Sequence, residues 1–67
     1  MSIIFRLPQS DEVRHATPKQ LAALIHQAED TDDDVLLLQA TDEVAWRSEW
    51  FIVMEWYWIL WGKEPPR

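Results

Sequence analysis

The chain has 67 residues, no cysteine and a formal net charge of −6. The absence of cysteine excludes disulfide bonds, cysteine-ligated zinc and a cysteine nucleophile, and it predicts a cytoplasmic location. The acidic charge argues against direct nucleic-acid binding, because phosphate contacts need a basic surface. A domain this small buries only about 60% of the surface that its unfolded chain exposes. We therefore expect oligomerisation or a partner to supply part of its stability.

The N-terminal part predicts a short strand followed by a loop. Residues 2–7 are β-branched and aromatic, and Pro8 ends the run, which predicts a strand over 2–7. Residues 9–16 are polar and predict a loop, with one helical turn at 10–15 as an option.

The strongest local signal is a helix start at Thr17. Thr17 has the side chain of a helix cap, Pro18 suits the first helical position, and Gln20 completes a capping box. This start predicts a helix over about 18–29. Apolar residues follow at helical spacing: Leu21, Leu24, Ile25 and Ala28.

A short apolar run follows the acidic turn after this helix. The run predicts a buried strand over 35–40, with residues 41–49 as a connection. Because periodicity alone does not exclude a helix here, a second helix capped by Thr31 is the competing interpretation.

The C-terminal apolar segment, residues 50–61, holds four of the five tryptophans, and Glu55 is its only charge. Its β-branched and aromatic content favours a strand over 50–60. The alternative is a mostly α fold in which residues 42–61 are helical, with Thr41 or Asp42 as the cap. Either structure leaves apolar side chains on more than one face, and a chain of this size can hardly cover both.

These elements predict one compact α+β domain over 1–67, in which the helix packs on a short sheet. Residues 63–67, with two prolines, are expected to form a frayed tail. The apolar segment is too short for a membrane-spanning helix, which needs about 20 apolar residues. It also lacks the lysine- and arginine-rich polar face of a membrane-surface helix, so we expect no membrane binding.

No pattern predicts a metal ion or a cofactor. Asp30, Asp32 and Asp34 alternate as the first ligands of a calcium loop do. That loop also needs Gly at the position of Val35 and Glu at the position of Thr41, and both are missing.

Catalysis is not expected either. Ser10, Asp11 and His15 have the residue types of a catalytic triad, but no nucleophile elbow surrounds any serine. We therefore expect no catalytic residue and no enzymatic activity.

The distribution of charge predicts a protein partner. Residues 29–55 carry nine acidic residues against Arg47 alone, a net of −8. Such a segment suits a basic surface, and Trp side chains often anchor protein–protein interfaces. The predicted partner-binding residues are acids and tryptophans: Asp30, Asp32, Asp33, Asp34, Asp42, Glu43, Glu49, Glu55, Trp46, Trp50, Trp56 and Trp58.

The expected function is that of a small non-enzymatic binding protein. The favoured interpretation is an inhibitor that occupies the basic, nucleic-acid-binding surface of a larger protein, because carboxylates can take the place of phosphates. Small phage-borne nuclease inhibitors share this size and charge, which is an analogy of composition only. One alternative is a structural homodimer or assembly subunit, and another is an antitoxin or immunity protein that neutralises a basic toxin. Glu55 either lies at a solvent-exposed edge of the apolar segment or pairs with an Arg or Lys across an interface.

Overall fold

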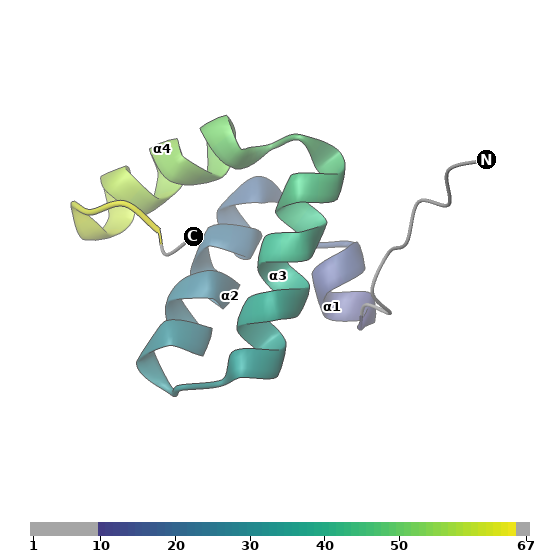
Figure 1. The fold of residues 1–67 in the computed structure, drawn as a ribbon. Helices are drawn as coiled ribbons and strands as arrows, with labels where there is room; N and C mark the ends of the chain where they lie inside the picture. The colour runs from purple at the N-terminus through teal and green to yellow at the C-terminus, as the bar shows by residue number, and fades with distance from the viewer. Residues whose placement is uncertain (1–9, 66–67) are drawn as a thin grey trace.

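The structure is a computed structural model, which describes residues 10–65. Its elements are helices: α1 (Asp11–Arg14), α2 (Pro18–Asp30), α3 (Asp34–Arg47) and α4 (Trp50–Trp61). Figure 1 shows α2 and α3 side by side, α4 along one side of this pair, and α1 on the other side of α3. No strand occurs within residues 10–65, so the α+β prediction is wrong and the described chain is all-helical.

The predicted helix is confirmed as α2. The backbone N–H of Gln20 donates to Thr17 Oγ1 at 3.2 Å, and the N–H of Thr17 donates to Gln20 Oε1 at 2.8 Å. This is the expected capping box, with Pro18 in the first turn. The optional helical turn before it is present as α1. The predicted apolar stripe is buried: Leu21, Leu24, Ile25 and Ala28.

The strand predicted over 35–40 is wrong, because this segment belongs to α3. The helix is capped by Asp33, whose Oδ1 accepts from the N–H of Leu36 at 3.1 Å. Thr31 is not the cap, because its hydroxyl donates to the carbonyl of Gln27 at the end of α2. The side chains that pack inward recur at helical spacing: Leu36, Leu37, Ala40 and Val44.

The strand predicted over 50–60 is also wrong, because the segment forms α4. A helix satisfies its own backbone hydrogen bonds, whereas a strand needs a neighbouring strand that residues 10–65 do not provide. The alternative helix start is not observed, because Thr41 and Asp42 lie inside α3. Ser48, with φ 56°, ends α3, and Gly62, with φ 66°, ends α4.

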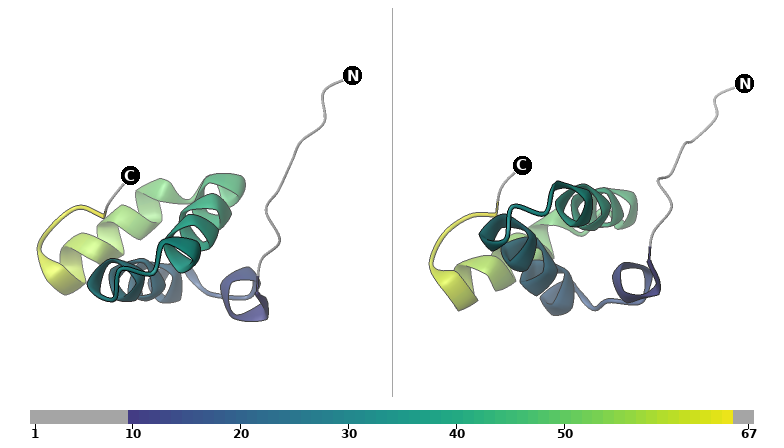
Figure 2. Two further views of the ribbon diagram at one scale, coloured as in Figure 1. Left: turned by 60° about the horizontal axis from the view of Figure 1, so that its bottom comes forward. Right: turned by 90° about the horizontal axis from the view of Figure 1, so that it is seen from below.

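Helix α2 is the centre of the packing, since it contacts both α3 and α4. Figure 2 shows the same arrangement from two other directions. Side chains from all four helices meet in the core: Val13, Leu21, Ala22, Leu24, Ile25, Ala40, Val44, Val53 and Tyr57. A core of this size is thin, which agrees with the length of the chain.

Arg47, at the end of α3, connects this helix to α1 through hydrogen bonds. Its Nη1 donates to the carbonyl of Ala16 at 2.6 Å, and its Nη2 donates to those of Val13 at 3.2 Å and Arg14 at 2.7 Å. Its Nε pairs with Glu43 Oε2 at 2.6 Å. The guanidinium therefore binds carbonyls at the end of α1 and in the segment that follows it, where few backbone donors are available.

The strand predicted over 2–7 lies outside the described residues. Among the described helices, none combines the length and the apolar character needed to cross a membrane.

Candidate functional site

Helix α4 has an inner face that is packed and an outer face that is exposed. Val53 and Tyr57 are fully buried on the inner side, and three tryptophans (Trp50, Trp56 and Trp61) pack partly against the core. The outer face of α4 consists of Phe51, Ile52, Glu55, Trp58 and Ile59, all exposed. Phe51 is 84% exposed and Trp58 is 60% exposed, which is unusual for side chains of this size.

Glu55 lies at the centre of this outer face. Phe51 and Ile52 precede it by four and three residues, and Trp58 and Ile59 follow it by three and four. Residues at these spacings are neighbours on a helix surface, so four apolar side chains surround the carboxylate. Within residues 10–65, no hydrogen bond or ion pair engages the Glu55 carboxylate. The site is an apolar surface with one charge at its middle.

Part of this face forms the wall of an open pocket of about 430 Å³. Glu55 and Glu64 are its two charged residues, and the second lies just beyond the end of α4. The remaining lining residues are apolar: Phe51, Met54, Trp58 and Ile59. A pocket of this composition suits an apolar segment that carries a cation.

Contacts at the end of α2 hold α4 in this orientation. The Tyr57 hydroxyl donates to Glu29 Oε2 at 2.8 Å. The His26 ring stacks on the Trp61 ring at a centroid distance of 4.1 Å, and Tyr57 packs against the same indole at 4.8 Å. Burial raises the pKa of Tyr57 well above its usual range, and the hydrogen bond to Glu29 and the charge of that carboxylate act in the same direction. These contacts prevent the outer face from rotating into the core.

Two of the predicted anchor tryptophans belong to the inner side. Trp56 is half-buried, and Lys19 Nζ lies 5.1 Å from its ring centroid, a distance at which a cation and an aromatic ring attract each other. Trp50 is also half-buried against the core. Trp58 and Trp46 are exposed, on α4 and α3 respectively. Trp50 and Trp56 therefore pack against the core, whereas Trp46 and Trp58 are exposed to solvent.

The predicted acidic residues also divide into groups. Glu43 is 2% exposed and pairs with Arg47, and Glu49 is 3.4 Å from the same guanidinium. Asp42 is half-buried on α3. Four further carboxylates are exposed between the end of α2 and the first turn of α3: Asp30, Asp32, Asp33 and Asp34. The acids and the exposed tryptophans thus do not form one continuous set on one helix face.

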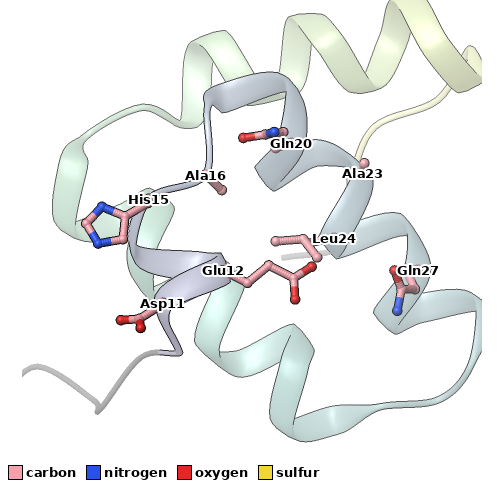
Figure 3. Close-up of a pocket in the computed structure, with 8 residues that line it drawn as sticks. All are labelled: Asp11, Glu12, His15, Ala16, Gln20, Ala23, Leu24 and Gln27. Carbon is pink, nitrogen blue, oxygen red and sulfur yellow. The ribbon is translucent and has the colours of Figure 1, made fainter.

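A second pocket, of about 440 Å³, lies between α1 and α2. Figure 3 shows Glu12 of α1 beside Leu24 of α2, with Asp11 and His15 farther from Leu24 at the edge of the pocket. Ser10 is not among the lining residues, and its hydroxyl accepts from the N–H of Val13 as the helix cap. The residues of a triad are therefore not assembled here. Within residues 10–65, no group of His, Asp and Glu could hold a metal ion.

The predicted partner-binding residues include Glu55 and Trp58 of the outer face but not Phe51, Ile52 and Ile59. The helical alternative for this segment leaves Phe51, Ile52, Trp58 and Ile59 on one apolar side, whereas the favoured strand divides them between two faces. The signal that could have found them is their spacing of three or four residues from the single charge.

Comparison with protein-family models, with curated protein sequences and with solved structures finds no match to this chain.

Proposed function

We propose that the chain is a self-associating structural subunit, which buries the outer face of α4 against another copy. The single observation that carries this proposal is the exposure of four large apolar side chains around one carboxylate on a short helix. A helix that is apolar on all sides is normally buried on all sides. Contiguous exposed patches of this kind mark interaction surfaces in most soluble proteins.

The distribution of contacts supports assembly more than inhibition. An acidic inhibitor would need its carboxylates and tryptophans free to meet a basic target. Glu43 and Glu49 are already engaged by Arg47, and Trp50 and Trp56 pack inward. The outer face of α4 has only Glu55 as a charge, and an obligate homo-oligomer characteristically uses such an apolar surface. We propose that the protein works in this way without enzymatic activity, in the cytoplasm.

Sedimentation equilibrium of the full chain across a wide concentration range tests this function. We expect a dimer or larger assembly, and we expect Ile59→Ser to weaken the association at least tenfold. Leu38→Ser is the matched control, because Leu38 is 58% exposed on α3 and Ile59 is 64% exposed on α4. Each variant should retain the helical circular dichroism of the parent.

A chain that stays monomeric at every concentration would overturn the proposal. So would equal weakening by both substitutions, because the outer face of α4 would then have no special role.

A further inference from the structure

We propose that the outer face of α4 receives residues 3–7 of a second copy, with Arg6 of that copy paired to Glu55. This inference rests on the proposed self-association and names the segment that covers the surface. It connects the exposed face of α4 with the apolar sequence that precedes α1.

The chemistry of the two partners matches. The pocket on α4 combines apolar walls with two carboxylates, Glu55 and Glu64. Residues 3–7, Ile-Ile-Phe-Arg-Leu, combine four apolar side chains with one cation, Arg6. A guanidinium suits this position because it binds carboxylates through a planar pair of donors and also packs on aromatic rings, such as those of Phe51 and Trp58.

The same carboxylate argues against a simple contact of α4 with α4. In a two-fold symmetric contact centred on the outer face, Glu55 would meet Glu55 of the other copy. Two carboxylates in an apolar contact repel each other and lose hydration. A segment with its own cation covers the face without that cost.

The location of α1 favours the segment of another copy over the chain's own. Figures 1 and 2 show α1 on one side of α3 and α4 on the other. Arg6 is four residues before Ser10, so their Cα atoms are at most about 14 Å apart, and the arginine side chain adds its own length to this reach. The outer face of α4 points away from the other helices, so the chain's own segment would have to pass around them. In a dimer, two copies can exchange these segments reciprocally.

The area of such an exchange is sufficient. Four apolar side chains of this kind remove on the order of 300–500 Å² from water. With a similar area lost by the exposed outer face of α4, two reciprocal contacts bury on the order of 1,200–2,000 Å², the size of a specific protein–protein interface.

Charge exchange between two variants of the full chain tests the pairing. We expect Arg6→Glu alone and Glu55→Arg alone each to weaken the dimer at least tenfold. When the two variants are mixed, both reciprocal contacts become complementary, so a heterodimer should form with an affinity within about threefold of the parent. Sedimentation equilibrium of each variant and of the mixture measures this. Arg14→Glu and Glu12→Arg, exposed positions on α1, repeat the charge changes and should leave the dimer unchanged.

The outcomes separate this inference from the proposed function. If the parent dimer tolerates Arg6→Glu, or if mixing the two variants does not restore dimerisation, the exchange of residues 3–7 is overturned. Self-association itself would still stand. A monomeric parent overturns both. Rescue confined to the double variant Arg6→Glu/Glu55→Arg, without rescue on mixing, would place the contact within one chain and refute the exchange.

Discussion

The ion pair of Arg47 and Glu43 gives the sharpest test of the packing. Replacing Arg47 by Met leaves the Glu43 carboxylate, whose side chain is 3% exposed, without its nearest counter-charge. Removing one partner of a buried pair typically costs about 3–5 kcal/mol. The carbonyls of Arg14 and Ala16 also lose the guanidinium donor, and the carbonyl of Val13 keeps only the N–H of Ala16, at 3.3 Å. Because the Arg47 side chain is 21% exposed, solvent screens part of this loss.

We therefore expect Arg47→Met to lower the free energy of unfolding by about 3 kcal/mol. A domain of this length has a total stability of about 3–10 kcal/mol, so at the lower end of this range the variant would be only partly folded. Urea unfolding at a fixed protein concentration, followed by far-ultraviolet circular dichroism, measures the change.

The double variant Arg47→Met/Glu43→Gln keeps the prediction testable if the single variant unfolds. A neutral amide at this position removes a buried charge that has lost the Arg47 guanidinium, so the double variant should be at least about 1 kcal/mol more stable than Arg47→Met. The reasoning is refuted if Arg47→Met costs less than about 1 kcal/mol, or if the two substitutions simply add their separate losses.

Two further predictions concern α2 and its contact with α4. Burial and Glu29 raise the pKa of Tyr57 in the folded state, so the protonated hydroxyl stabilises the fold at neutral pH. This stability should fall as the pH rises above about 10, where the unfolded state loses its proton first. Urea titrations across that range should show the loss in the parent and not in Tyr57→Phe, and equal curves for both would contradict the assignment. Thr17→Ala should cost about 1 kcal/mol, because the capping bond from the N–H of Gln20 is lost. Thr17→Ser, which retains the hydroxyl, is its control, and an equal loss in both would reject the capping role.

Interactions between neighbouring residues were sufficient to predict a helix start that depends only on those residues. Thr17, Pro18 and Gln20 indicated the start of α2 correctly, because a capping box is made by side chains within one turn. The apolar stripe that follows was also recognised, since polar residues separate its members at a helical period. Both signals are contained within the helix itself.

Local chemistry was insufficient for α3 and α4. The apolar run at 35–38 has no polar residue to reveal a period, and aromatic content in 50–60 favoured a strand. Packing against α2 selected the helical stripe of Val53 and Tyr57 instead, because no second strand is present among the described residues to pair with.

The sequence alone determined that this acidic chain has more apolar surface near its C-terminal end than one helix can cover. Only the tertiary structure decided which residues carry that surface. Trp56 turned inward beneath Lys19, whereas Phe51 and Trp58 stayed outside around Glu55. The physical reason is that a helix divides its side chains between inside and outside according to where its neighbours lie, and a sequence does not state where the neighbours are.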